Sequence, residues 1–320
     1  MKFFKRLTLL MALLVSVLAM TACSSTSLSI NGYLWFKNTS AFKPGWSEVS
    51  TYGVSLVHTT PINTEELADK TSTIEILDGS YTTTLQTKTD NGNYYVYETN
   101  FSLTFTGEVE DENGDKVIRT FYESFSTKSE FKDTLEPIKT EKVYSSDSSN
   151  YKYNYLITYS GSTATAVLRE SDINGLGVNE QTFTFKKFNK KTYIDNDLLL
   201  LIPRLFNVDK SFSRSFRTID VLSNKMFDMN MYGYNKNSDL HVENFANYTL
   251  NGVDLSVENP EISCAHIEMV INDTFSGYPL EAYFAQDRDT HRHRLVTTYT
   301  RFGDRGYLKF SLENVVVTGD

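Results

Sequence analysis

The feature that most constrains the fold of this chain is a repeated alternation of apolar and polar side chains between Asn-Gly pairs. Within residues 94–110, apolar and polar side chains alternate along the run Phe101-Ser102-Leu103-Thr104-Phe105. Asn and Gly adopt positive φ at little cost, so Asn91-Gly92 and Asn113-Gly114 favour tight turns at the two ends of this segment. The sequence therefore predicts a meander of long antiparallel strands over residues 81–127.

Aromatic strands continue through the second half of the chain. Tyr151, Tyr153, Tyr155 and Tyr159 occur at every second position, with Ile157 between the last two, and would share one face of a strand. The chain has 20 Tyr and 21 Phe but only 6 Pro, a composition that favours strands. Further strands are predicted over residues 163–170, 183–188, 242–250, 253–258, 262–271, 280–285, 294–300 and 307–317.

Two segments are predicted to form short helices. Asp195 can cap a helix with the body Leu198–Phe206, and Pro203 would kink that helix or end it early. Thr64–Lys70 is a second candidate of one or two turns. Together with the strands, these segments predict an all-β fold with one or two short helices. Since no internal linker is evident, residues 45–320 are predicted to form a single β-rich domain.

The first 23 residues have the pattern of a bacterial lipoprotein signal. Lys2, Lys5 and Arg6 precede the apolar run Leu7–Met20, which is shorter than the roughly 20 residues that a membrane-spanning helix needs. Met20-Thr21-Ala22-Cys23 then resembles the lipobox at which a lipid is attached to cysteine. The pattern predicts cleavage before Cys23 and lipidation of that residue; plain secretion is the alternative.

This signal defines the expected location of the protein. Residues 1–22 would be a signal peptide, and residues 23–44 would hold the lipidated Cys23, a polar tether and the first strand. Two or more acyl chains anchor a protein stably, so the membrane is an expected partner. Ser24 permits sorting to the outer membrane of a Gram-negative host. In a Gram-positive host, the anchor would hold the protein on the outer face of the cell membrane.

Charge and cysteine content exclude several classes of function. The formal net charge of −9 becomes about −12 once the three basic signal residues are removed. That charge argues against nucleic acid as a partner and against a polybasic membrane patch. Cys264 is the only cysteine besides Cys23, so the processed chain can form no intramolecular disulfide once Cys23 carries lipid. The sequence calls for no cofactor.

Five segments beyond residue 50 carry a resemblance to a known family: Tyr52–Ser55, Leu135–Lys139, Asp197–Phe206, Phe275–Gly277 and Tyr283–Asp287. Through these segments, the chain resembles a family of exported bacterial proteins of unknown function. The family is thought to form a curved antiparallel half-barrel similar to the lipoprotein carrier LolA and its receptor LolB. The resemblance implies one large curved antiparallel sheet, or half-barrel, and no catalytic constellation.

Cys264 and His266 form the first candidate site. They are two residues apart on a predicted strand, so their side chains point to the same side, followed by Glu268. A cysteine beside a histidine can provide a thiolate nucleophile. Packing or a cross-strand polar pair is the better interpretation, because no partner that would orient the histidine can be identified.

His291 and His293 form a second candidate, beside Asp287 and Asp289. Imidazoles at this spacing can share a metal ion, and carboxylates could complete its coordination. The surrounding segment, residues 286–294, also contains three arginines, whose charge opposes cation binding. A solvated hairpin tip is therefore preferred, and no metal site is predicted.

Two acidic turns resemble calcium loops superficially. Asp111, Asn113 and Asp115 have the right spacing, but the loop lacks the Gly and Glu that an EF-hand needs at its sixth and twelfth positions. In Asp172–Gly177, a leucine stands where an oxygen ligand belongs. Both segments are interpreted as turns. The chain also lacks the motifs of serine hydrolases, zinc proteases and nucleotide-binding loops, so we do not predict an enzyme.

The tyrosines Tyr151, Tyr153, Tyr155 and Tyr159 have two interpretations. On the concave face of a half-barrel, they could line a cavity that holds an acyl chain or another apolar ligand. Alternatively, they cover a packed core and reach water with their hydroxyls. We name these four residues as the candidate ligand-binding residues.

The sequence thus predicts a non-catalytic envelope lipoprotein that binds an apolar or envelope-derived ligand, or a partner protein. One alternative is a structural or assembly lipoprotein whose packed sheet is an interaction surface. A weaker alternative is an envelope hydrolase that uses Cys264 and His266.

Overall fold

The computed structural model describes residues 44–61, 74–89, 94–132, 136–188, 193–195, 198–205, 208, 211–234, 248–250, 252–255, 262–271, 279–286, 293–302 and 306–319. Several predictions lie outside these residues. They concern the signal and lipidation site at residues 1–23, the helix at Thr64–Lys70, and the candidate metal ligand His291.

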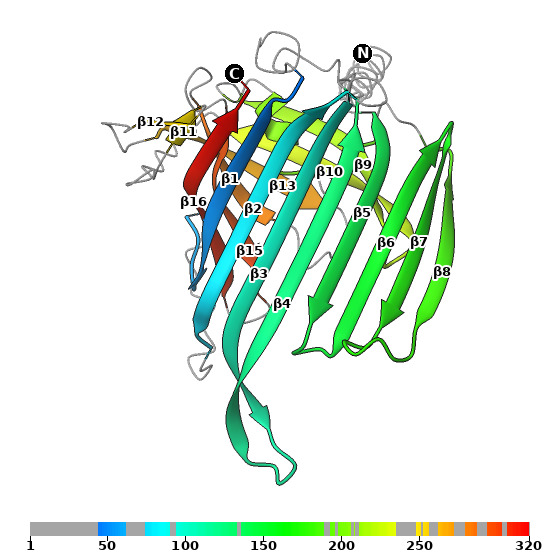
Figure 1. The fold of residues 1–320 in the computed structure, drawn as a ribbon, viewed down its shortest axis with the longest axis vertical. Coiled ribbons are helices and arrows are strands. Elements are labelled where there is room, and N and C mark those ends of the chain that lie inside the picture. Colours follow the sequence, from blue (N-terminus) through cyan, green and yellow to red (C-terminus); the bar gives the residue numbers. More distant parts are fainter. Residues whose placement is uncertain are drawn as a thin grey trace, which may run out of the picture.

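Strands dominate the described part of the chain (Figure 1). They are β1 (Ser47–Val57), β2 (Ile76–Lys88), β3 (Tyr94–Glu110), β4 (Lys116–Phe131), β5 (Pro137–Ser146), β6 (Tyr151–Ser160), β7 (Thr163–Ser171), β8 (Asn179–Lys186), β9 (Phe212–Asp220), β10 (Lys225–Tyr234), β11 (Tyr248–Leu250), β12 (Val253–Leu255), β13 (Cys264–Ile271), β14 (Pro279–Ala285), β15 (Leu295–Arg301) and β16 (Tyr307–Thr318).

The strands form one large sheet with the order β8-β7-β6-β5-β4-β3-β2-β1-β16-β15-β14-β13-β10-β9. All neighbours along this path are antiparallel, and the short strand β11 pairs with β12 and, in parallel, with β16. The path ends at β8 and β9, so the sheet does not close into a barrel. The prediction of an all-β fold built on one large antiparallel sheet is confirmed.

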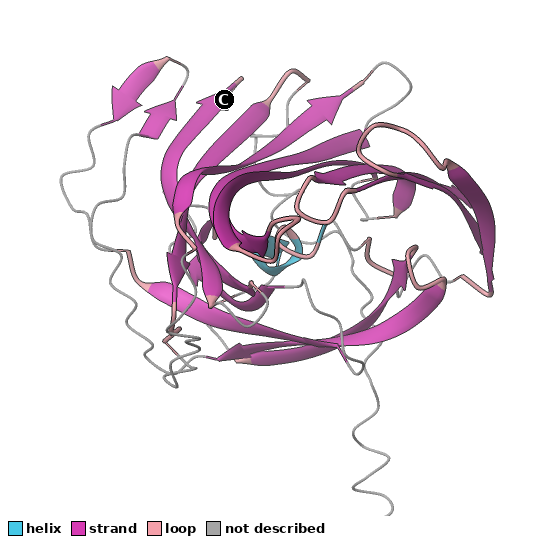
Figure 2. Ribbon diagram, turned by 90° about the horizontal axis from the view of Figure 1, so that it is seen from below, coloured by secondary structure: helices cyan, strands magenta, loops and turns pink. Residues whose placement is uncertain are grey.

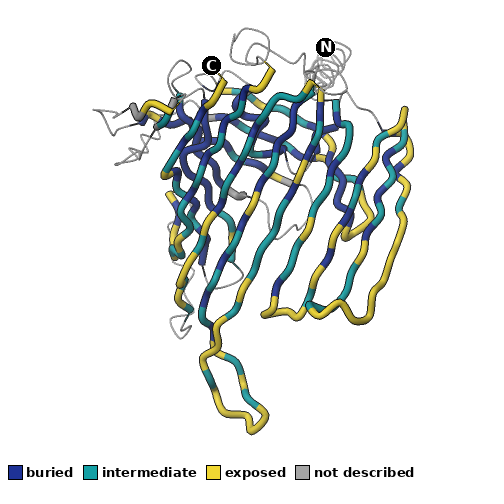
Figure 3. The backbone as a smooth tube through the Cα atoms, in the orientation of Figure 1, coloured by how far each residue is buried: buried dark blue, intermediate teal, exposed yellow. Residues whose placement is uncertain are grey.

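Alternation explains why the longest strands form. In β3, Phe101, Leu103 and Phe105 are buried, whereas the intervening Ser and Thr side chains are partly exposed. At the following turn, the carboxylate of Asp111 accepts the backbone N–H groups of Asn113 and Asp115 at 2.8 and 2.9 Å. The resulting β3–β4 hairpin projects beyond its neighbours, and its tip is exposed (Figures 1 and 3).

The sheet is strongly curved, and its two halves face one another across the interior (Figure 2). Its core consists of two separate hydrophobic clusters. The larger cluster contains residues of β1–β4 and β13–β16 together with the buried segment 198–202. The smaller one is built on β6–β8, with Tyr193, Ile219 and Val221 packed against them. The two clusters therefore meet at a boundary on the concave side of the sheet.

The predicted helix Leu198–Phe206 is wrong: the described segment contains only a 3-10 turn, η2 (Ile202–Leu205). Backbone bonds from Leu201 N to Leu198 O and from Arg204 N to Leu201 O follow the three-residue spacing of a 3-10 helix. The segment is buried between the two halves of the sheet, and Pro203 cannot continue an α-helical hydrogen-bond ladder. No helix of the described part is long and apolar enough to cross a membrane.

Asp195, the residue predicted to cap this helix, makes tertiary contacts in the structure. Its carboxylate is buried and accepts hydroxyl groups from other strands, including Tyr159 at 2.9 Å, Ser129 at 3.4 Å and Thr140. Asp195 therefore connects the segment before the 3-10 turn to β4, β5 and β6. This is a tertiary contact that local sequence cannot reveal.

Candidate ligand-binding site

A row of aromatic side chains crosses the concave face of the sheet, one from each of six consecutive strands. Each member lies opposite the next in the strand register, so the row runs perpendicular to the strands. We call this set the aromatic row; its members are Tyr52, Tyr81, Phe101, Phe125, Tyr144 and Tyr153.

Rings within the row are in contact. Phe101 and Phe125 stack with their centroids 5.0 Å apart, and Tyr144 and Tyr153 stack at the same distance. Tyr155, the next inward-facing residue on β6, lies nearly parallel to Tyr153 at 6.2 Å. Stacked rings hold one another in place, so this part of the sheet presents a preformed aromatic wall.

A cavity of about 400 Å³ lies against this wall. On its other sides are Thr298 and Thr300 of β15, Leu308 of β16, and the β9–β10 turn at residues 221–222. Its volume is within the range of 300–1,000 Å³ that is typical of small-molecule sites. Apolar and aromatic side chains predominate in its lining, which suits an apolar ligand.

The cavity occupies the boundary between the two hydrophobic clusters. Tyr81 and Phe310 on one side belong to the larger cluster, whereas Tyr153, Tyr155 and Ile219 on the other belong to the smaller one. Protein interiors normally pack to high density. The space therefore arises because the curved sheet keeps its two clusters apart along this boundary.

Charged groups also line the cavity. Glu123 of β4 is half-buried, and its carboxylate accepts the Tyr144 hydroxyl at 3.1 Å. Burial raises the pKa of Glu123, and Asp147 adds to the rise against the lowering effect of the Tyr144 bond. The ammonium of Lys142 lies 5.3 Å from the centroid of Phe125. Arg301 is exposed at the margin.

The structure divides the four candidate tyrosines into two pairs. Tyr153 and Tyr155 line the cavity. Tyr151 lies beyond it and donates to the carboxylate of Glu170. Tyr159, at the other end of β6, donates to Asp195 and lies 2.9 Å from the Tyr193 hydroxyl. The two end residues thus serve polar contacts, and the two central ones face the cavity.

Several cavity residues are missing from the sequence-based prediction. Tyr81, Phe101, Phe125 and Tyr144 come from different strands, and only the pairing register aligns them with Tyr153. The hairpin turns contain a partial signal, because a turn fixes the register of the two strands it joins. In the β3–β4 hairpin, the observed loop of residues 112–114 sets the register in which Phe101 pairs with Phe125.

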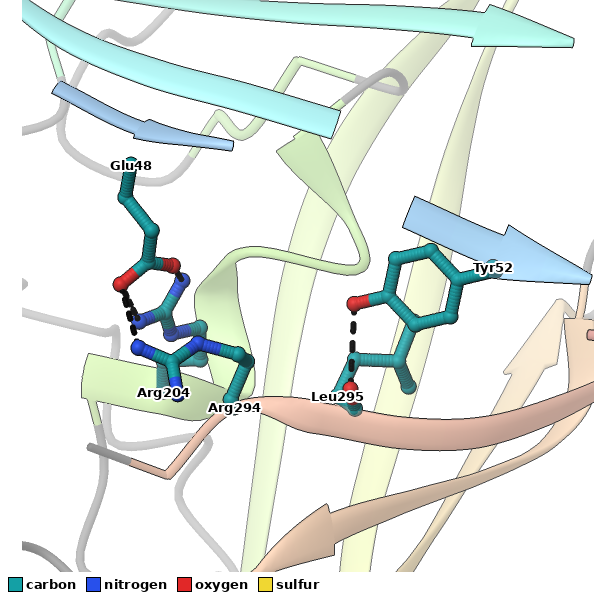
Figure 4. A network of polar contacts seen from close by, with 5 residues as sticks. All are labelled: Glu48, Tyr52, Arg204, Arg294 and Leu295. Atoms are coloured by element: carbon teal, nitrogen blue, oxygen red, sulfur yellow. Dashed lines mark hydrogen bonds and ion pairs between the residues drawn. The ribbon is translucent and has the colours of Figure 1, made fainter. Parts of the chain in front are cut away.

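A buried ionic network lies elsewhere in the interior (Figure 4). Arg204 donates to both carboxylate oxygens of Glu48 at 2.7 and 3.2 Å, and Arg294 donates to one of them at 2.7 Å. The exposed fractions of the three residues are 2%, 6% and 1% for Glu48, Arg204 and Arg294. Burial alone would raise the pKa of Glu48, but the two guanidinium groups lower it far below its ordinary value. The network connects β1 to the 3-10 turn and to the start of β15.

Cys264 and His266 share a face of β13 as predicted, and both are buried. The Cys264 thiol donates to the Ile262 carbonyl at 3.5 Å, and burial raises its pKa to about 12. Burial also lowers the pKa of His266, whose ring lies 5.1 Å from that of Tyr283. At neutral pH this environment keeps the thiol protonated and the imidazole neutral, a poor arrangement for nucleophilic chemistry.

His293 is also buried and so is not part of a solvated tip, whereas residues 287–292 lie outside the described residues. Its Nδ1 donates a hydrogen bond to the carbonyl oxygen of Ala285, the last residue of β14, at 3.0 Å. Among the residues that the structure describes, no group of three or more His, Cys, Asp or Glu side chains could hold a metal ion.

No family model matches the chain, and no curated protein matches it. One solved structure, a β-barrel-like protein of the domain of unknown function DUF1849 from Brucella abortus, is similar over 87% of this chain and 100% of its own, with 11% identity and a TM-score of 0.46.

Proposed function

We propose that this protein is a non-catalytic envelope lipoprotein that binds an apolar or amphipathic ligand inside its curved sheet. The cavity of about 400 Å³ against the aromatic row is the observation that carries the proposal. Aromatic and aliphatic side chains line this space, and an apolar ligand that filled it would leave water and contact them.

The sequence supports the cellular part of the proposal. The lipobox-like Met20–Cys23 and the short apolar run before it are typical of an exported protein that acyl chains hold to a membrane. A concave sheet with an interior cavity also suits the half-barrel plan of LolA and LolB, to which the sequence bears its resemblance. The ligand would then come from the envelope.

The cavity is tested by a titration with the apolar fluorophore N-phenyl-1-naphthylamine. The full-length chain should carry Cys23→Ala, which removes the attachment site of acyl chains that would compete with the probe. We expect saturable binding that Tyr153→Ala weakens at least fivefold, because the substitution removes a ring from the cavity wall. Asn154→Ala, on the exposed face of the same strand, is the matched control and should leave the affinity unchanged. Equal affinities in all three proteins would refute a site at this wall.

The lipid anchor is tested by cell fractionation. We expect the unmodified chain in the membrane fraction and the Cys23→Ala chain outside it, since acylation is the expected source of attachment. Mass spectrometry of the N-terminal peptide provides the second readout, an acylated Cys23 in the unmodified chain. Two results together would refute lipidation: the Cys23→Ala chain stays entirely in the membrane fraction, and mass spectrometry finds no acyl group on Cys23 of the parent chain.

A further inference from the structure

The cavity is not uniformly apolar, and its charges indicate the kind of ligand that it suits. Asp220 holds the β9–β10 turn, because its carboxylate accepts the N–H groups of Leu222 and Ser223 at 3.1 and 3.0 Å. Arg301 is exposed at the margin. Glu123 of β4 and Lys142 of β5 are the charged side chains that line the cavity from the strands of the aromatic wall itself.

The wall already holds one cation over an aromatic face. The Lys142 ammonium lies 5.3 Å from the Phe125 centroid, within the range of a cation–π contact. Next to Phe125 in the register, Tyr144 bonds to Glu123, so a carboxylate lies at the edge of the same group of rings. Aromatic faces beside a carboxylate are the combination that recognises ammonium groups.

From this arrangement we propose that the ligand is a cationic amphiphile, with its ammonium group at Glu123 and the adjoining rings of Tyr144 and Tyr153. Its alkyl part lies along the apolar side of the cavity, toward Leu308 and Phe310. The inference rests on the proposed function, because it requires the cavity to bind a ligand. The half-buried carboxylate of Glu123 favours such a head group, because a bound cation offsets the free-energy cost of removing the carboxylate's negative charge from water.

The test compares three ligands with the same tail: octyltrimethylammonium, octanol and octyl sulfate. Isothermal titration with the full-length Cys23→Ala chain should give an affinity for the ammonium about five- to tenfold above that for octanol, with octyl sulfate weakest. Glu123→Gln should remove the preference for the ammonium and leave octanol binding unchanged. Glu130→Gln removes a carboxylate from the same strand on the opposite face, and it should preserve the preference.

The outcomes separate the two proposals. Octanol and octyltrimethylammonium that bind equally, or a preference that survives Glu123→Gln, would overturn the ammonium site while the cavity itself stands. The same holds if octyl sulfate binds most tightly, because Lys142 would then select the head group. If none of the three binds, the ligand-binding function fails and the ammonium site fails with it.

Discussion

Replacing Glu48 by Gln is expected to lower the free energy of unfolding by about 3–5 kcal/mol, because breaking a buried ion pair leaves uncompensated charge inside the protein. In the folded chain, this substitution leaves the guanidinium groups of Arg204 and Arg294 without the carboxylate that both contact. Urea unfolding followed by circular dichroism measures the loss. The control is Glu180→Gln in the exposed pair with Arg169, which should cost no more than about 1 kcal/mol.

The same network predicts how stability depends on pH. The folded pKa of Glu48 lies below its ordinary value of 4.5, so the folded state binds the proton less readily than the unfolded state. The stabilising contribution is therefore complete above pH 4.5 and is lost as the pH falls toward the folded pKa. The difference between the parent and Glu48→Gln should shrink in that range. A difference that is constant from pH 7 to pH 3, or a loss below about 1 kcal/mol at pH 7, would contradict this role.

Thr300→Trp is expected to weaken ligand binding at least tenfold without destabilising the fold. Thr300 lines the cavity on β15, across from the aromatic row, so an indole there would occupy the space that the ligand needs. Filling existing space commonly stabilises a protein, and we expect the free energy of unfolding to stay equal or rise by about 1 kcal/mol. The N-phenyl-1-naphthylamine titration measures binding, and urea unfolding measures stability.

Thr158→Trp provides the matched control for this substitution. Thr158 is exposed on the outer face of β6, so the same change there adds an indole outside the cavity. Its affinity for the probe should match that of the parent chain. Undiminished binding by Thr300→Trp would place the probe elsewhere, and a drop in both variants would indicate an effect of the added indole alone.

Local sequence predicts the strands of this protein well where polar and apolar residues alternate. Residues 94–110 and 151–159 are examples, and the observed strands are β3 and β6. The same reasoning does not identify β9 and β10. In β9, Arg and Ser interrupt the apolar positions, and β10 relies on Met229 and Met231 for its buried face. Methionine has little strand preference of its own, so tertiary packing defines these strands.

The candidate site shows the same division between local and long-range information. The alternation along β6 is sufficient to place Tyr153 and Tyr155 on an inward face. The aromatic row, however, depends on how neighbouring strands pair, and a shift of one residue would turn each side chain to the opposite face. Glu123 and Thr300 come together only because the sheet curves back on itself, which no segment encodes alone.

The position of a bound ligand tests the central claim most directly. Crystals of the full-length Cys23→Ala chain, soaked with 8-bromo-1-octanol, would show the bromine by its anomalous signal. We expect that signal in the cavity between the aromatic row and Thr300, with the rings of Tyr144 and Tyr153 in place. A cavity closed by side chains, with bromine bound only on the outer surface of the sheet, would contradict the claim that the curved sheet binds a ligand in its interior.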